Sequence, residues 1–340
     1  MDHRSNRGGR DRVNHSAGRP GFSWYLPPGL SAALLLALEI AFFTWYLAPP
    51  HGGSHPFANA GNFALILKYS SIFGIGAIAA ALIIGSGGID LAPGAVMALS
   101  SVVVGHLFVE AAWPLWAAVA AGIGVGVGSG ALAAVLITRV GLPPFIATLG
   151  VMGLTRGSAF LVTEGQFYDL SARLPPSFSP FGIRLDLWPG VSLAALTLVF
   201  HVLLVHTATG RHLLAVGSNP RAAHYAGVRV ARVQTFVYVT GGVLAAFAGV
   251  VLAVVQGQGK ADLAMGYELD IIAAAVVGGA SLSGGRASVV GAVVGALIFG
   301  VLRNALTQIP GGTYADRAIL GLAVILVVVF DRLARGTKEA

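Results

Sequence analysis

Long apolar runs constrain what this chain can fold into more than any other feature of its sequence. Ten stretches approach the length of about 20 mostly apolar residues that a transmembrane helix needs. Six of them are good candidates, and four are less clean because glycine and proline break them. We therefore expect the chain to cross a membrane about ten times. The expected spans are 30–48, 63–84, 91–109, 114–137, 144–163, 188–207, 233–256, 267–284, 287–304 and 317–333.

The composition favours the same class of protein. Only 10% of the 340 residues are charged and 56% are hydrophobic, whereas a soluble domain carries about 25% charged residues. The 47 glycines agree with this, because small residues let membrane helices approach closely. The absence of cysteine excludes disulfide and thiol chemistry. The predicted fold class is an all-α polytopic membrane protein.

The basic residues indicate an orientation. If the N-terminus is cytoplasmic, 14 of the 21 basic residues lie in inside segments and six in outside segments, with Arg156 inside a span. This is the positive-inside bias of membrane proteins. It explains the net charge of +7 without a nucleic-acid partner. Both termini are therefore predicted to be cytoplasmic.

We expect three parts along the chain: a disordered basic tail (1–22), a transmembrane domain (23–333) and a short C-terminal tail (334–340). A signal peptide is an alternative for the start. However, the first apolar run is long enough to span and no small-residue cleavage site follows it, so we expect it to be retained. The segment 208–232 holds four arginines and no acid, and we place it in the cytoplasm. The loop 164–187 mixes both charges, and we place it outside.

A short motif occurs twice. Residues 89–94 read IDLAPG and residues 261–266 read ADLAMG. In the predicted topology they lie on opposite sides of the membrane, which an inverted internal repeat of the kind common in transporters would produce. A rival match of 87–94 with 278–285 would imply a parallel repeat instead.

Asp90 lies in a stretch rich in glycine and proline, which predicts a broken helix between two spans. Non-helical backbone at membrane depth survives only where protein or water satisfies it, and a carboxylate there is costly. Asp90 could cap the following helix and orient the break, contact a polar solute, or lie at the interface without a special role. Candidates for a translocation pathway are Gly88, Asp90, Leu91, Gly94, Glu268 and Asp270.

Other charged residues within or beside spans have two interpretations each. Glu268 and Asp270 suit the dipole of a first helical turn or the lining of a solute path. Glu39 suits a paired position or the lipid interface. Arg156 requires an acid or access to the interface, and the sequence does not name its partner.

Motifs for enzymatic or metal chemistry are missing. His201 and His206 are five residues apart, which is off a common helix face, and no H-E-x-x-H occurs. The glycine-rich stretch before Lys260 has neither the length nor the Ser or Thr of a phosphate loop. An integral membrane enzyme would need paired carboxylates or histidine clusters, so we predict that the chain is not an enzyme and holds no metal.

A short, capped helix is predicted in the polar segment at mid-chain. Asn219 suits an N-cap, Pro220 the first helical position and Gly227 a left-handed stop. About two turns lie between the caps, and a helix so short is marginal alone. The predicted helix comprises Asn219, Pro220, Arg221, Ala222, Ala223, His224, Tyr225 and Gly227.

Four motifs together resemble the monosaccharide branch of the ABC-importer permeases, which includes ribose, xylose, arabinose and galactose permeases. The resemblance covers residues 60–333. The motifs are GGIDLAPGAVMALSS (87–101), PPFIATLGVMGLTRG (143–157), AVGSNPRAAHYAGVRVARV (215–233) and GYELDIIAAAVVGGASLSGGRASVVGAVVGALIFGVL (266–302).

This resemblance implies the translocation subunit of an ATP-driven sugar importer in a bacterial plasma (inner) membrane. It implies a second permease subunit, in a homodimer or heterodimer, a cytoplasmic ABC ATPase that holds ATP and Mg, and an extracytoplasmic sugar-binding protein. The chain itself would carry no cofactor, and the capped helix would be the ATPase-coupling helix. Ala92 and Pro93 replace the Ser-Val pair that is usual in the family, which puts a solute contact there in doubt. A related solute remains the alternative: a nucleoside, an autoinducer sugar or a branched-chain amino acid.

Overall fold

A computed structural model of the chain describes residues 28–325, apart from 50–52, 176–177, 179, 185, 316–317, 320 and 323–324. The predicted tails and most of the predicted span 317–333 lie outside the described residues.

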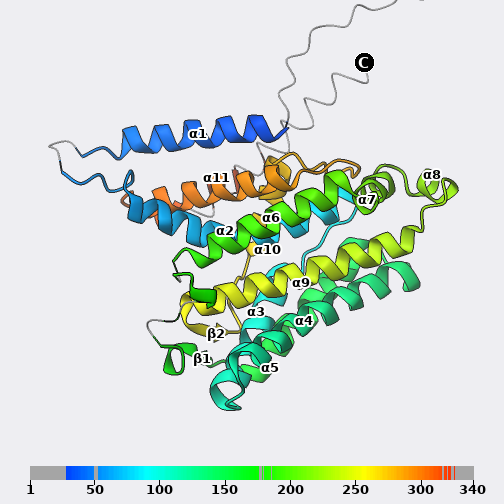
Figure 1. The fold of residues 1–340 in the computed structure, drawn as a ribbon, viewed down its shortest axis with the longest axis horizontal. Coiled ribbons are helices and arrows are strands. Elements are labelled where there is room, and N and C mark those ends of the chain that lie inside the picture. The colour runs from blue at the N-terminus through cyan, green and yellow to red at the C-terminus, as the bar shows by residue number, and fades with distance from the viewer. Residues whose placement is uncertain are drawn as a thin grey trace, which may run out of the picture.

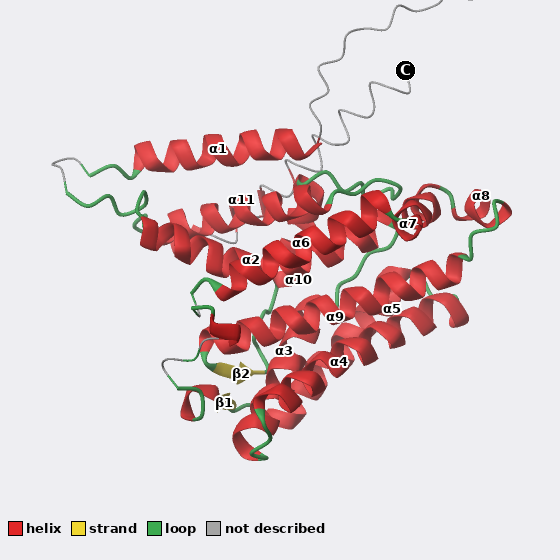
Figure 2. Ribbon diagram, viewed as in Figure 1, coloured by secondary structure: helices red, strands yellow, loops and turns green. Residues whose placement is uncertain are grey.

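The described part is almost wholly helical (Figures 1 and 2). In chain order the helices and strands are α1 (Pro28–Tyr46), α2 (Ala60–Gly85), α3 (Pro93–Gly105), η1 (His106–Glu110), α4 (Leu115–Val135), η2 (Leu136–Val140), α5 (Pro144–Thr163), β1 (Phe167–Asp169), η3 (Leu170–Ala172), η4 (Pro180–Gly182), α6 (Trp188–His206), α7 (Ala208–Ser218), α8 (Pro220–Tyr225), α9 (Val230–Gln256), β2 (Gln258–Lys260), α10 (Tyr267–Val277) and α11 (Val289–Thr307).

Seven of the described helices are long and apolar enough to cross a membrane. The shorter apolar helix Leu30–Tyr46 lies within α1. The all-α multi-pass class predicted from the sequence is therefore confirmed, while the count of ten spans stays a prediction. The seven spans are Ala60–Gly85, Pro93–Glu110, Leu115–Val140, Pro144–Thr163, Trp188–His206, Val230–Gln256 and Val289–Thr307.

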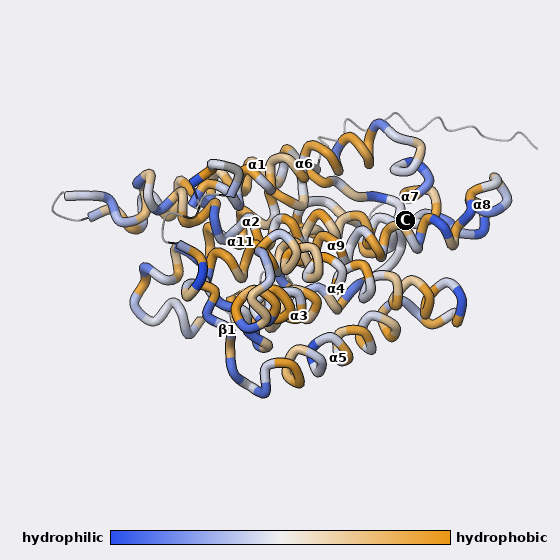
Figure 3. Tube along the Cα trace, turned by 60° about the horizontal axis from the view of Figure 1, so that its bottom comes forward, coloured by the Kyte–Doolittle hydropathy of each residue, from blue (hydrophilic) through white to orange (hydrophobic). Residues whose placement is uncertain are grey.

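Two helices form the centre of the bundle. The apolar windows of α2 and α9 are 83% and 78% buried, against 28% for α5 and for α6. Large apolar side chains such as Leu161 on α5 and Leu198 on α6 are exposed, as expected for helices that face lipid or another membrane subunit. Polar residues gather at the two ends of the bundle, around α8 at one end and near β1 at the other (Figure 3).

Glycines bring α4 and α9 into backbone contact. A methyl group on Gly126 would overlap the carbonyl oxygen of Gly242, and one on Gly242 would overlap that of Gly126. One turn further along α4, Gly130 lies against the backbone of Tyr238. Such close approach of small residues is a main source of packing energy between membrane helices, because lipid removes the hydrophobic drive.

Both central helices stop at a break that leads into a second helix. After α2 the chain is non-helical over 86–92 until α3 begins, and after α9 it contains β2 and turns over 257–266 until α10 begins. Because α10 ends at Val277, it is shorter than the predicted span 267–284. Eleven residues rise about 16 Å, roughly half of the hydrocarbon core, so the helix α10 is too short to cross the core by itself. The Gly278–Gly279 pair follows its end.

Two features were not predicted. The segment 208–232 is not only a loop with one short helix, because α7 fills its first half and is capped by Thr207, whose hydroxyl accepts a hydrogen bond from the Gly210 N–H. The loop 164–187 contributes β1, which pairs antiparallel with β2.

Candidate functional site

The first break is held by side chains from its own loop and from α5. The Asp90 carboxylate accepts a hydrogen bond of 2.8 Å from the Ala92 N–H. Thr148 of α5 accepts one from the Leu91 N–H at 3.2 Å and donates to the Ile89 carbonyl at 3.3 Å. Asp90 therefore fixes the backbone just before α3 and does not bond to the first turn of that helix. This contact fits the orienting part of the predicted role better than the capping part.

Gly88 is the point where α9 touches this break. A side chain there would collide with the hydroxyl of Tyr238. Tyr238 is almost fully buried, and its hydroxyl has no hydrogen-bond partner among the described residues. A buried hydroxyl without a partner costs free energy, so this contact is less favourable than a hydrogen-bonded one would be.

The second break is held by Arg156, whose partner the sequence did not name. Its guanidinium group donates hydrogen bonds of 2.7 Å and 2.8 Å to the carbonyls of Ala261 and Leu263. Since Thr148 holds the first break, α5 binds both breaks from one helix. The eight residues between Thr148 and Arg156 correspond to about 12 Å along the helix axis.

The two breaks also touch each other. A methyl group on Gly94, in the first turn of α3, would lie 2.5 Å from the carbonyl oxygen of Ala264 and 2.5 Å from Oε2 of Glu268. The repeated motifs IDLAPG and ADLAMG therefore meet in space. Glu268 lies at this meeting point. The inverted repeat itself stays a prediction.

Asp270 points toward α11 and not toward the contact between the two breaks where Glu268 lies. Its carboxylate pairs with Arg303 of α11 at 2.9 Å, and Arg303 stacks over the ring of Phe73 at 5.0 Å. The rings of Phe73 and Tyr267 are 4.4 Å apart. These groups border a cavity of about 330 Å³ between α2, α10 and α11. Its lining is Leu65, Ile66, Tyr69, Ser70, Phe73, Tyr267, Gly300, Arg303, Asn304 and Thr307.

Arg156→Gln should destabilise the fold by about 3 kcal/mol, because two hydrogen bonds from a charged donor to buried carbonyls are lost. Arg156→Lys retains the positive charge but loses the planar set of donors. Its stability should therefore lie between that of the wild type and that of Arg156→Gln. Thermal unfolding of the purified chain in detergent measures both. If Arg156→Gln has the same melting temperature as the wild type, Arg156 does not hold the second break.

The predicted short helix is present, with its predicted ends. Asn219 accepts a hydrogen bond of 3.0 Å from the Ala222 N–H, and Pro220 begins α8. Gly227 has a φ of +86°, and the Val228 and Gly227 N–H groups bond to the carbonyls of Ala223 and His224. This pair of bonds is the Schellman stop of a helix. Within the helix Ala223 is buried, while the Tyr225 side chain is 89% exposed.

A glycine junction joins this segment to the first break. The end of α7 packs so closely on the end of α2 that a methyl group on Gly217 would overlap the Gly85 carbonyl oxygen. The same oxygen accepts a hydrogen bond of 3.0 Å from the Gly285 N–H. Gly284 lies against Gly217 and Gly87. These backbone contacts connect the end of α7 directly to the loop that carries Asp90.

The opposite end of the bundle carries exposed charges in local pairs. Arg184 and Asp186 form an ion pair of 2.8 Å, and the hydrogen bond from Arg184 lowers the pKa of Asp186. Lys260 and Asp262 pair at 2.9 Å. The carboxylate of Asp169 accepts a hydrogen bond from the Ser171 N–H and begins the short helix η3. The described part of the predicted outer loop thus carries charged groups held in local contacts.

Asp90→Asn should leave the chain folded, because the amide oxygen can still accept the bond from the Ala92 N–H. Solute uptake should fall, since the charge beside the buried Tyr238 hydroxyl is lost. Asp90→Ala also removes the hydrogen-bond acceptor and should lower the free energy of unfolding by about 1 kcal/mol. Uptake per folded molecule in membrane vesicles, with abundance from a blot, tests this. Wild-type uptake in both variants would exclude Asp90 from transport.

Comparison with known proteins identifies the family. Residues 62–328 match the model of the family described as "Branched-chain amino acid transport system / permease component". The chain belongs to this permease family. The match covers the two breaks, α5 and the capped helix α8, so all of the candidate groups described above lie within the permease domain.

Curated relatives resemble the chain over most of its length. The ribose import permease protein RbsC of Bacillus subtilis is 36% identical over 80% of this chain and 84% of its own. The L-arabinose ABC transporter permease protein AraH of Azospirillum brasilense is 31% identical over 91% and 89%. The fructose import permease protein FrcC of Rhizobium meliloti is 34% identical over 91% and 86%. No solved structure gave a significant match.

Proposed function

We propose that the chain is the translocation subunit of an ATP-driven importer of a monosaccharide. The observation that carries this proposal is the glycine junction, which links a capped, exposed helix to a break in the middle of the bundle. Relatives that import ribose, arabinose and fructose support a sugar as the solute.

Helix α8 is the proposed contact with a separate ATPase, which binds ATP and Mg. Arg221, His224 and Tyr225 are exposed large side chains on it. A docked helix would transmit movement through α7 to the glycine junction, and from there to the loop 86–92. The positive-inside distribution supports our proposal that this end of the bundle and both termini lie on the cytoplasmic side of a bacterial inner membrane.

The cavity beside Asp270 suits a neutral, hydroxyl-rich solute. Its one arginine is paired with Asp270, so the cavity wall carries little net charge. The aromatic rings of Phe73 and Tyr267 offer flat apolar faces, and Ser70 and Asn304 offer hydrogen-bonding groups. The volume of about 330 Å³ lies at the lower end of the range of about 300–1,000 Å³ for small-molecule sites. We place the solute path on this side of α10.

Two further partners complete the proposed assembly. We propose that the polar surface of 164–187 and β2 binds a sugar-binding protein outside the membrane. A second permease subunit would pack on the outer face of α5, where a Cβ atom added to Gly150, Gly153 or Gly157 would have no atom within 4 Å. Glycines at this spacing share one helix face and permit close packing with another membrane helix.

Uptake by vesicles that contain the whole transporter tests the solute class. The proposal predicts accumulation of labelled ribose, arabinose or fructose that unlabelled sugar abolishes and leucine or a nucleoside does not. Accumulation of leucine or of a nucleoside instead would contradict a sugar as the solute; of these two, the family description names only branched-chain amino acids.

A further inference from the structure

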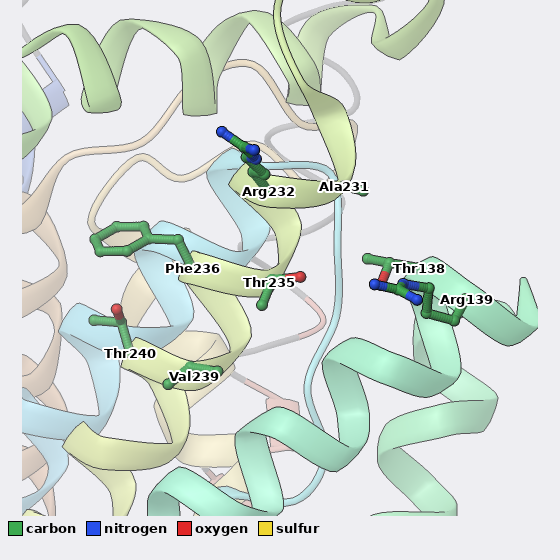
Figure 4. A pocket seen from close by; sticks show the side chains of 8 residues that line it. All are labelled: Thr138, Arg139, Ala231, Arg232, Thr235, Phe236, Val239 and Thr240. Carbon is green, nitrogen blue, oxygen red and sulfur yellow. The ribbon is translucent and has the colours of Figure 1, made fainter.

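A groove lies between the end of α4 and the start of α9, at the same end of the bundle as α8. Its volume is about 560 Å³. Thr138 and Arg139 come from η2 at the end of α4, and the other lining residues come from α9 (Figure 4). The lining residues are Thr138, Arg139, Ala231, Arg232, Thr235, Phe236, Val239 and Thr240.

The groove begins where the glycine contact between the two helices ends. Gly126 and Gly130 bring α4 into contact with the backbone of α9. Two turns later α4 continues as the π-helix η2, and bulkier side chains line the space against α9. Phe236 and Val239 of α9 contribute apolar side chains to the groove, and Arg139 of η2 and Arg232 of α9 contribute one basic side chain from each helix.

The charge of this groove is not balanced. No acidic side chain lines it. Among the residues that the structure describes, neither Arg139 nor Arg232 has a hydrogen bond or an ion pair to its guanidinium group. By contrast, Arg303 in the cavity of about 330 Å³ is paired with Asp270. A third cavity, between α2, α6 and α11, has no arginine or lysine in its lining.

We propose that this groove binds the phosphate headgroup of an anionic phospholipid from the cytoplasmic leaflet. Basic pockets between membrane helices on this side are suited to such headgroups, and a guanidinium group can bind two phosphate oxygens at once. The hydroxyls of Thr235 and Thr240 supply further polar contacts, and Phe236 and Val239 face the glycerol and upper acyl chains. The bound lipid would brace the start of α9 against α4, close to the segment that contacts the ATPase.

Lipid binding to the purified full-length chain in detergent tests the proposal. The probes are radiolabelled phosphatidylglycerol and phosphatidylcholine. The wild type should bind phosphatidylglycerol more tightly. Arg139→Gln and Arg232→Gln should each weaken that binding about five-fold, and the double variant should bind both lipids equally. Arg211→Gln, a matched change on α7 outside the groove, should keep the wild-type preference.

Several results would overturn the proposal. They are an absence of preference in the wild type, a preference that survives in the double variant, and an equal loss in Arg211→Gln, which would indicate attraction by general surface charge. Displacement of phosphatidylglycerol by millimolar inorganic phosphate would show a site for free anions instead. Because both arginines are exposed, the variants should fold, and an unchanged melting temperature without lipid confirms this.

Discussion

Gly217→Ala should destroy transport although it adds only one methyl group. The methyl would overlap the Gly85 carbonyl oxygen and lie 2.7 Å from the Gly285 nitrogen. These are backbone atoms, which cannot rotate away as a flexible side chain can. Overpacking of this kind costs about 1–3 kcal/mol, and occasionally more; we expect the upper end here. Uptake into vesicles should fall to background, and the melting temperature of the purified chain should fall with it.

Gly128→Ala is the matched control for this prediction. It makes the same glycine-to-alanine change, in the membrane helix α4, and no atom lies within 4 Å of the added methyl. Alanine is also the better helix former, by about 1 kcal/mol. The control should therefore be as stable as the wild type or slightly more so. If Gly217→Ala transports as well as Gly128→Ala, the glycine junction does not transmit movement from α7 to the first break.

Changes in α8 should uncouple ATP hydrolysis from transport without affecting the membrane domain. Gly227→Val forces a β-branched residue into a left-handed conformation, with a φ of +86° in the wild type. That costs about 1–2 kcal/mol even for an unbranched residue, enough for roughly a ten-fold loss of the docked state. Arg221→Glu reverses an exposed charge, and Asn219→Ala should cost about 1 kcal/mol of local helix stability.

Co-purification of the ATPase and its stimulation by the loaded binding protein measure these effects. Gly311→Val is the control for co-purification, since Gly311 has a φ of +77° with no atom within 4 Å and lies beyond α11, at the other end of the bundle from α8. It should keep the ATPase. If Gly227→Val and Arg221→Glu both retain full association and full stimulation, α8 is not the coupling element.

The sequence was most informative where local rules govern the structure. Apolar runs predicted the spans of α2, α4, α5 and α9 because lipid requires long helices. Asn219, Pro220 and Gly227 predicted both ends of α8 because caps act within one turn. Asp90 was singled out because glycine and proline around it indicated a break.

Contacts between distant segments could not be predicted in the same way. Nothing near Arg156 in the sequence indicates that it binds carbonyls of residues more than 100 positions away, and Asp270 gives no sign that Arg303 is its partner. The amphipathic pattern of α7 and the N-cap Thr207 could have predicted this helix. They were missed because the arginines of the segment led us to interpret it as a polar loop. The end of α10 was missed because Gly278–Gly279 were interpreted as small residues inside a longer span, whereas the helix ends at Val277, directly before them.

ATP dependence of uptake in proteoliposomes tests the central claim most directly. The chain is reconstituted with its proposed ATPase and sugar-binding protein, and labelled sugar is added outside. The account predicts uptake that requires ATP hydrolysis on the α8 side, stops with a non-hydrolysable analogue and is lost in Arg221→Glu. Uptake by the permease alone, driven by an ion gradient and indifferent to ATP, would contradict it.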